Sequence, residues 1–161
     1  MDHDSHNCLV LDVGKTNVKI HVLDERQRSL AIYTKDNETL ENAPYPHADV
    51  DGLWRWMMQV FHTCAAEYDI EAIAVSAHGA TAALVDPSLP GNGLVLPIMD
   101  YEWRDVESVN EPYEQLRPPF HETFSPSLPG GLNIGLQLVL QKQHLAGEFE
   151  SSRAQIGRAH V

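Results

Sequence analysis

The chain has 161 residues, enough for one domain with a real core and too few for two full-sized ones. Acidic residues outnumber basic ones by 23 to 11, and the resulting net charge of −12 disfavours nucleic acid as a partner, since such binders need a basic face. No run approaches the roughly 18 apolar residues of a membrane span, and the polar N-terminus MDHDSHN is unlike a signal peptide. We therefore expect a cytoplasmic protein with no membrane or nucleic-acid partner.

The cysteine content indicates a reducing compartment. Cys8 and Cys64 are the only cysteines, one at the start of a predicted strand and one on the apolar face of a predicted helix. We expect two buried thiols, because a disulfide framework needs more cysteines. The residues His3, His6 and Cys8 have a loose metal-ligand spacing, but a disordered terminus is the favoured interpretation because no second cluster matches it.

The first third of the chain predicts an antiparallel meander. The run CLVLDV, residues 8–13, is short and almost wholly apolar, and residues 17–23 alternate apolar with polar side chains. Residues 14–16 form the turn between these strands, and a third strand is expected over residues 29–35. Residues 36–50 contain few aliphatic side chains, which predicts a surface loop.

The strongest helical pattern covers residues 51–68, where apolar side chains recur at helical spacing. Asp49 or Asp51 is expected to cap its start. The later pattern predicts, in chain order, a buried strand over residues 70–77, a strand over residues 80–86, a short strand over residues 94–99, a polar, proline-rich segment over residues 100–129 and a helix over residues 133–149.

The element order β-β-β-α-β, followed by further strand, predicts an α/β domain with a mixed sheet and flanking helices. By analogy, this order matches one half of the actin-like ATPase (ribonuclease H-like) fold. In that fold the opening antiparallel hairpin presents phosphate ligands at its turn.

The first turn, in LVLDVGKTNVKIHVLDE, contains residue types suited to phosphate chemistry. Asp12 ends a buried strand, where a carboxylate can hold Mg²⁺ directly or through water. Gly14 allows close approach of the backbone to a phosphate, and Lys15, Thr16 and Asn17 supply donors. On spacing alone, a plain hairpin in which Gly and Asn only make the turn is the favoured interpretation.

The same stretch resembles the first phosphate motif of the FGGY carbohydrate kinases, DxGTTxxR/K followed by a strand that ends in Asp. The matching positions are Asp12, Gly14, Thr16, Lys19 and Asp24, and Lys15 replaces the first threonine. The segment HADVDGLWRWM is similar to the E-x-D-x-x-x-W segment of that family. Asp49 and Trp54 match there, and His47 replaces the acid.

Two later segments extend the resemblance. IEAIAVSAHGATAALVD is similar to the strand pair I-x-x-I-x-I-S-x-Q…D, with Ser76 and Asp86 matching and His78 in place of Gln. LVLPIMDYEWRD resembles P-x-I-x-W-x-D-x-R, with Pro97, Ile98 and Arg104 fitting, Glu102 in place of Asp and Asp100 in place of Trp. PGGLNIGLQLVLQ fits the helix that follows. The nearest subgroups are the sugar kinases of the L-fuculose, L-rhamnulose and xylulose type.

The resemblance implies an ATP-dependent kinase with Mg²⁺ and a small-molecule sugar or polyol substrate. It places Asp12 near Mg²⁺ and Lys19 near the transferred phosphate. The remaining nucleotide-binding positions that it implies are Gly14, Lys15, Thr16 and Asn17. The positions that it implies for the sugar are His78, Gly79, Ala80, Glu102 and Arg104.

Structural interpretations stay open for the sugar positions. His78 follows a buried strand, where a lone histidine is as often a hydrogen-bonded structural residue as a ligand. Arg104 beside Glu102 and Asp105 also fits a surface ion-pair cluster of little energetic weight. Trp54, Trp56 and Trp103 are expected to pack rather than to stack on a sugar.

The family's catalytic base and adenosine site lie in a second domain. Residues 8–150 are expected to form the N-terminal kinase domain, without that C-terminal domain, so the chain alone is expected to be inactive. Residues 151–161 end in IGRAHV, which resembles translated sequencing adapter and predicts a non-native tail, with an ordinary frayed terminus as the alternative. A non-catalytic sugar- or nucleotide-binding module and a purely structural domain remain as other classes. A homo-oligomer is compatible with the sequence.

Overall fold

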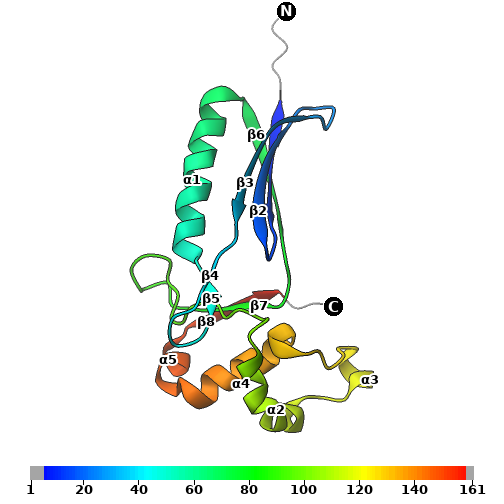
Figure 1. The fold of residues 1–161 in the computed structure, drawn as a ribbon, viewed down its shortest axis with the longest axis vertical. Coiled ribbons are helices and arrows are strands. Elements are labelled where there is room, and N and C mark those ends of the chain that lie inside the picture. The colour runs from blue at the N-terminus through cyan, green and yellow to red at the C-terminus, as the bar shows by residue number, and fades with distance from the viewer. Residues whose placement is uncertain (1–5, 159–161) are drawn as a thin grey trace, which may run out of the picture. The chain divides into compact units, whose positions relative to one another are not determined.

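The computed structural model describes residues 6–158, and describes side chains for residues 6–154 (Figure 1). The chain divides into two compact units. Unit 1 comprises Met1–Glu38 and Asp49–His78, and unit 2 comprises Thr39–Ala48 and Gly79–Val161. No helix in the described part of the chain is long and apolar enough to cross a membrane.

Unit 1 is a four-stranded mixed sheet in the order β3-β2-β1-β6, with one long helix packed on it. Strand β1 is antiparallel to β2, β2 is antiparallel to β3, and β1 is parallel to β6. This confirms the predicted meander, helix and following strand. The elements are β1 (Asn7–Val13), β2 (Asn17–Leu23), β3 (Ser29–Asp36), α1 (Val50–Glu67) and β6 (Ile70–Ala77).

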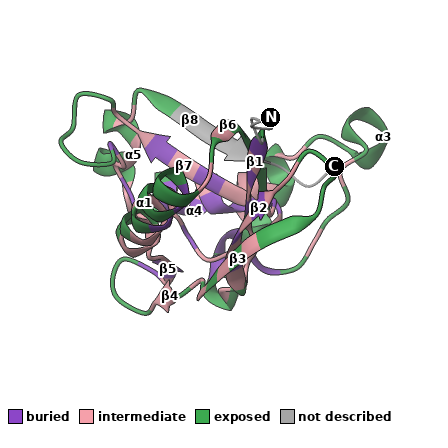
Figure 2. Cartoon of the chain, turned by 90° about the horizontal axis from the view of Figure 1, so that it is seen from above, coloured by how far each residue is buried: buried purple, intermediate pink, exposed green. Residues whose placement is uncertain are grey.

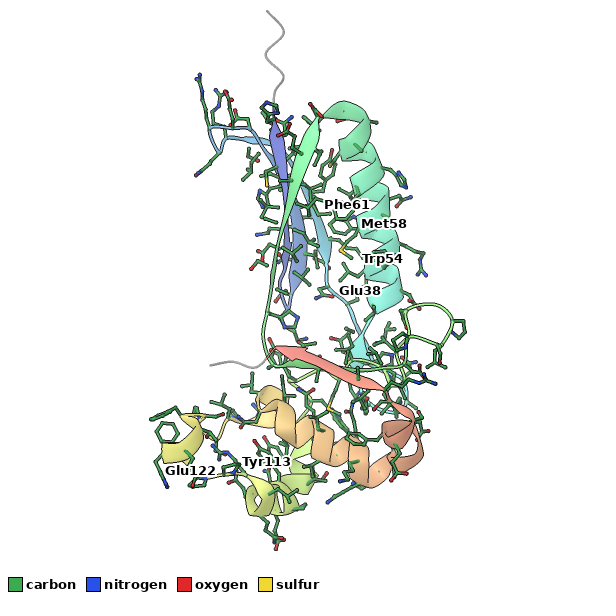
Figure 3. All side chains as sticks on the ribbon, turned by 180° about the vertical axis from the view of Figure 1, so that it is seen from behind. Glu38, Trp54, Met58, Phe61, Tyr113 and Glu122 are labelled. Atoms are coloured by element: carbon green, nitrogen blue, oxygen red, sulfur yellow. The ribbon has the colours of Figure 1, made fainter. Side chains whose placement is uncertain are left out.

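The core of unit 1 forms because alternate residues of β1 and β2 point to the same face of the sheet. Helix α1 begins where the Asp49 carboxylate accepts a hydrogen bond of 2.9 Å from the Gly52 N–H, as predicted for a cap. Phe61 points from α1 toward the strands (Figure 3). The buried residues of this core are Leu9, Leu11, Val18, Ile20, Val22, Val60 and Cys64.

Strand β6 was predicted to be a buried strand. The strand is confirmed, but its predicted burial is wrong. Ile73 and Val75 are 58% and 67% exposed, although the register places them beside Leu9 and Leu11. Among the residues of β6, Ile70 alone packs against the core under α1, because the buried cluster lies over β1, β2 and the partly buried side chains of β3. An apolar run predicts a strand but does not show which element covers it.

Unit 2 contains short strands and helices around a second core. Strands β4 and β5 pair antiparallel, as do β7 and β8, and buried and half-buried residues alternate along β7 (Figure 2). The elements are β4 (Thr39–Leu40), β5 (His47–Ala48), β7 (Thr81–Val85), η1 (Arg104–Val109), α2 (Asn110–Leu116), α3 (Phe120–Thr123), η2 (Gly130–Leu132), α4 (Ile134–His144), α5 (Ala146–Ser151) and β8 (Ala154–Arg158). The core side chains are Tyr45, Met99, Val106, Val109, Leu136 and Leu140.

Several expectations for unit 2 are wrong. Residues 36–50 are more than a surface loop, because Tyr45 is 3% exposed and flanked by the β4–β5 pair. Residues 94–99 form isolated bridges at each end instead of a strand, and Pro97 inside this segment cannot donate to a ladder. The proline-rich segment contains η1, α2 and α3, whose apolar signal is too short to predict a helix.

The C-terminal part also differs from expectation. The predicted last helix is broken at Leu145, whose backbone is not helical (φ −134°, ψ 45°) and whose side chain packs against the core of unit 2. Strand β8 was not predicted, because residues 154–158 lack strand periodicity. Arg153 leads into β8 with its N–H bonded to the Val85 carbonyl oxygen, 2.9 Å, and its guanidinium 3.3 Å from the Asp86 carboxylate.

Candidate functional site

The turn between β1 and β2 is a tightly closed hairpin tip. The Gly14 N–H donates to the Asn17 carbonyl oxygen at 3.0 Å. A Cβ atom at Gly14 would lie 2.7 Å from that oxygen, so this position requires glycine. Asn37 holds the tip from the end of β3, with its N–H donating to the Thr16 oxygen (2.9 Å) and its side-chain amide donating to the Gly14 oxygen (2.8 Å).

Asp12 and Lys19 lie directly opposite each other in the β1–β2 register. They occupy the face of the sheet away from the core, since the neighbouring Leu11 and Val18 are buried. Ser76 stands beside Asp12 in the β1–β6 register. Asp12 is exposed, and within residues 6–154 its carboxylate has no hydrogen bond or ion pair. This carboxylate is therefore open to a cation.

His78 lies beside the same end of the sheet. It directly follows β6, and its N–H donates to the Val13 carbonyl oxygen at 2.9 Å. Strands β1 and β6 are parallel, so their carboxyl ends, where ligands bind in open α/β sheets, meet at one edge. Unit 1 thus brings together Asp12, the turn at Gly14, and His78.

Gly79 and Ala80 belong to unit 2, where they precede β7. Ala80 has a left-handed backbone (φ 57°) and is fully buried. Its carbonyl oxygen accepts a 2.8 Å hydrogen bond from the Gln137 amide, which also donates to the Gly131 oxygen. The methyl group of Ala80 therefore has no surface for a ligand, and any role of this residue would rest on its backbone.

Glu102 and Arg104 line one cavity of about 240 Å³ in unit 2, together with Tyr101, Pro129, Gly130 and Leu132. The Arg104 guanidinium is 3.0 Å from the Glu107 carboxylate, so the ion pair of Arg104 is with Glu107 rather than with the neighbours Glu102 and Asp105. The Gly130 N–H donates to the same Glu107 oxygen at 2.7 Å. The hydrogen bond from Gly130 lowers the pKa of Glu107 most, and the contact with Arg104 lowers it further.

Three side chains important to these sites were missed by the sequence analysis. Asn37 holds the hairpin tip, Glu107 holds Gly130, and Gln137 holds Ala80 and Gly131. Each bonds to backbone far away in the sequence, and no local pattern records such a contact. Of the predicted residues, those of the hairpin and His78 are grouped in unit 1, while Gly79, Ala80, Glu102 and Arg104 are grouped in unit 2.

The donor set at the hairpin fits one magnesium ion held with phosphate. Mg²⁺ in nucleotide sites is usually bound by one or two carboxylates, with waters and phosphate oxygens completing the shell. Asp12 supplies one open carboxylate, and Lys19 supplies a cation opposite it. Within the described residues no group of three or more His, Cys, Asp or Glu side chains is placed to hold a metal, and His3 of the predicted N-terminal cluster lies outside them.

Comparison with solved structures gives many matches, whereas no family model and no curated protein matches the chain. A carbohydrate kinase from Novosphingobium aromaticivorans is 30% identical, with a TM-score of 0.84 over 96% of this chain and 32% of that chain. A xylulose kinase from Brucella ovis is 19% identical, with a TM-score of 0.76 over 94% of this chain and 32% of that chain. A gluconate kinase from Lactobacillus acidophilus is 15% identical, with a TM-score of 0.75 over 95% of this chain and 31% of that chain.

The chain thus spans about a third of the length of the kinases that it matches. The similarity covers nearly all of its own length and both units. It confirms the predicted resemblance to carbohydrate kinases and the predicted mixed α/β architecture. The chain has the actin-like ATPase fold of the corresponding third of a carbohydrate kinase.

Proposed function

We propose that this chain is the N-terminal part of an FGGY-type carbohydrate kinase, which transfers the γ-phosphoryl group of ATP to a hydroxyl of a ketose or related polyol in the cytoplasm. Residues 8–150 form the kinase portion in this proposal, and residues 151–161 a non-native tail. The observation that carries the proposal is the exposed, unpaired carboxylate of Asp12 beside the closed turn at Gly14. The 30% identity to a solved carbohydrate kinase supports it.

The hairpin would bind the phosphates of ATP. Asp12 would hold Mg²⁺, which supplies neutralisation of phosphate charge when bound. Lys15, Thr16 and Asn17 would donate to phosphate oxygens, and Lys19 would add positive charge on the face of Asp12. The N–H of Gly14 is already bonded to Asn17, so Gly14 contributes close approach rather than a donor.

Candidate sugar contacts lie in each unit, His78 in unit 1 and Gly79, Ala80, Glu102 and Arg104 in unit 2. His78 follows β6, and the backbones of Gly79 and Ala80 continue from it. Glu102 and Arg104 line a cavity of about 240 Å³, and a carboxylate and a guanidinium suit vicinal hydroxyl groups. In the family that the chain resembles, the catalytic base lies in a second domain, so we propose that residues 1–161 alone have negligible turnover.

A titration of the isotope-labelled chain with Mg·ATP tests whether the hairpin binds phosphate. The experiment does not require turnover. We expect amide shifts over residues 12–19 and at residue 78, and a loss of most of this binding in Asp12→Asn. Glu25→Gln is the matched control, because Glu25 is an exposed acid in the turn between β2 and β3. Equal binding by Asp12→Asn and the wild type would contradict the metal role, and sugar binding with no response to Mg·ATP would favour a non-catalytic binding module.

A further inference from the structure

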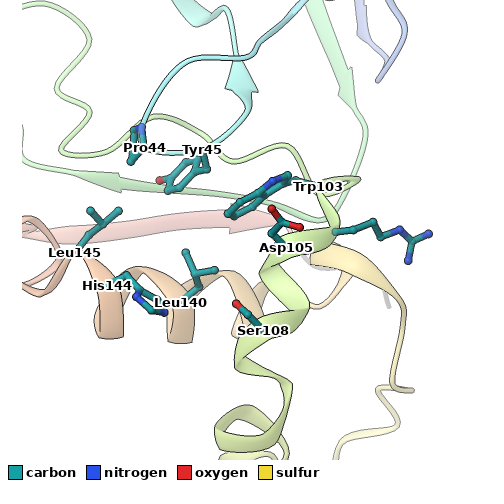
Figure 4. Close-up of a pocket in the computed structure, with 9 residues that line it drawn as sticks. Pro44, Tyr45, Trp103, Asp105, Ser108, Leu140, His144 and Leu145 are labelled. Carbon is teal, nitrogen blue, oxygen red and sulfur yellow. The ribbon is translucent and has the colours of Figure 1, made fainter.

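A second, larger cavity lies elsewhere in unit 2. It has a volume of about 500 Å³, within the range of small-molecule sites, and lies between the segment before β5, the start of η1 and the end of α4 (Figure 4). Its principal lining residues are Tyr45, Trp103, Asp105, Ser108, Leu140 and His144. None of these six residues lines the Glu102 cavity, although Arg104 borders both.

Two aromatic rings form one wall of this cavity. The ring centroids of Tyr45 and Trp103 are 6.0 Å apart and the ring planes meet at 38°. The Tyr45 hydroxyl is fully engaged, because it donates to the Pro97 carbonyl oxygen at 2.9 Å and accepts from the Gln141 amide at 2.7 Å. Burial raises the pKa of Tyr45 to about 12, so the phenol is neutral. Tyr45 is therefore a fixed and uncharged backing of this wall, and because it is only 3% exposed, the accessible aromatic ring is that of Trp103.

Unused polar groups border the same cavity. Within residues 6–154, the carboxylate of Asp105, the hydroxyl of Ser108, the imidazole of His144 and the indole N–H of Trp103 make no hydrogen bond or ion pair. The guanidinium of Arg104 is paired with Glu107, so the carboxylate of Asp105 is the acidic group left without an ion pair beside the cavity. The cavity thus offers one carboxylate acceptor and several groups that can donate, around an apolar wall.

We infer that this cavity is a binding site for a neutral polyhydroxylated ring, such as a monosaccharide, separate from the Glu102 cavity. The indole face of Trp103 packs against the C–H face of a sugar ring, while Asp105 accepts from hydroxyl groups and Trp103, Ser108 and His144 donate to them. The charge of Asp105 disfavours anions. This inference does not depend on kinase activity.

The test is a titration of the isotope-labelled chain with D-xylose and with L-rhamnose, followed by amide and indole resonances. We expect shifts in residues 103–108 and 140–145 and in the Trp103 indole N–H. Asp105→Asn removes the charge of an exposed acceptor and, independently, Ser108→Ala removes an exposed hydroxyl, neither of them touching the core, and we expect Asp105→Asn to weaken binding about tenfold. Trp103→Ala removes the wall.

A control variant separates this site from the other surfaces. Glu111→Gln changes an exposed acid in α2 that lines neither cavity, and we expect it to bind as the wild type does. Equal binding by the wild type, Asp105→Asn and Ser108→Ala would overturn the inference. Shifts confined to residues 101, 102 and 130, or stronger binding of adenosine or inorganic phosphate than of either sugar, would overturn it as well.

Discussion

The side-chain amide of Asn37 donates a 2.8 Å hydrogen bond to the carbonyl oxygen of Gly14, 23 residues earlier in the chain. The backbone N–H of Asn37 makes a second bond to the Thr16 oxygen. The end of β3 therefore holds the hairpin tip in the shape that presents Lys15 and Thr16. A ligand of the tip would meet a turn that is already ordered, which lowers the entropic cost of binding.

Asn37→Ala should loosen the tip without unfolding unit 1. It removes the side-chain bond and leaves the backbone bond to Thr16, so we expect a loss of about 1 kcal/mol in the stability of the turn. Amide hydrogen exchange of residues 14–17 measures this directly. Asn92→Ala, in a turn of unit 2, is the control. If exchange of residues 14–17 is unchanged in Asn37→Ala, the side-chain bond contributes nothing to the stability of the hairpin tip.

Gly14→Ala should distort the tip because the added Cβ would lie 2.7 Å from the Asn17 carbonyl oxygen, which belongs to the backbone. We expect a loss of about 1 to 3 kcal/mol in stability and weaker Mg·ATP binding. Gly91→Ala is a useful comparison, since its Cβ would meet nothing within 4 Å, although its φ of +77° strains any L side chain. If Gly14→Ala retains wild-type shifts with Mg·ATP, the shape of the turn is not required.

Ile20→Ala should destabilise unit 1 by about 2 to 5 kcal/mol, because Ile20 is fully buried between the sheet and α1 and the change leaves a cavity. Ile20→Val should cost only about 0.5 to 1.5 kcal/mol. Urea denaturation and exchange of the β1 and β2 amides measure both. Ile32→Ala, at a 57% exposed position of β3, should have little effect, and equal losses at the two positions would contradict the assigned faces of the sheet.

Cys64 should be unreactive in the folded chain. It is fully buried, and burial raises the pKa of its thiol, so little thiolate is present or accessible at neutral pH. We expect Cys8, which is only half-buried, to react first with a disulfide reagent, and Cys64 to react at the rate of opening of unit 1. In Cys8→Ser the fast phase should disappear, and rapid labelling of that variant would place Cys64 at the surface.

The hydrogen bond from the Gly130 N–H to the Glu107 carboxylate should weaken in acid. The pKa of Glu107 is lowered by the Gly130 N–H and by Arg104, so the fold favours the ionised carboxylate. Its contribution is therefore fully present above the usual glutamate pKa of about 4.3 and is lost as the pH falls through the lowered value. The protection of the Gly130 amide against hydrogen exchange should fall in that window, and in Glu107→Gln this fall in protection should be absent. Persistence of the fall in Glu107→Gln would assign it to another group.

The sequence predicted unit 1 well because each of its elements carries a local signal. Residues 17–22 alternate between polar and apolar side chains, residues 51–68 repeat at helical spacing, and Asp49 precedes the helix as a cap. The burial of β6 was not predictable, because it depends on which element covers the strand. In unit 2 the helices η1 and α2 are one or two turns long, which is too short for periodicity to distinguish them from loop.

The candidate sites likewise divide into residues with a local sequence signal and residues that depend on distant contacts. Asp12 and Gly14 could be found because they stand in one short motif with Lys19. Glu107 and Gln137 could not, because each recognises a backbone group 23 or 57 residues away, and their own neighbourhoods look like ordinary helix. The Tyr45–Trp103 wall likewise joins two segments that the sequence describes only as a loop and a polar stretch.

Strand β6 also bears on how the chain behaves in solution. It is an edge strand of the described sheet and exposes Ile73 and Val75, so it presents both unpaired backbone groups and apolar surface to other molecules. A net charge of −12 keeps copies apart by long-range repulsion, which acts over about 30 Å at 0.01 M salt and about 10 Å at 0.1 M. Colloidal stability of the chain should therefore fall as salt is added, because screening removes the repulsion and leaves the attraction between exposed edges.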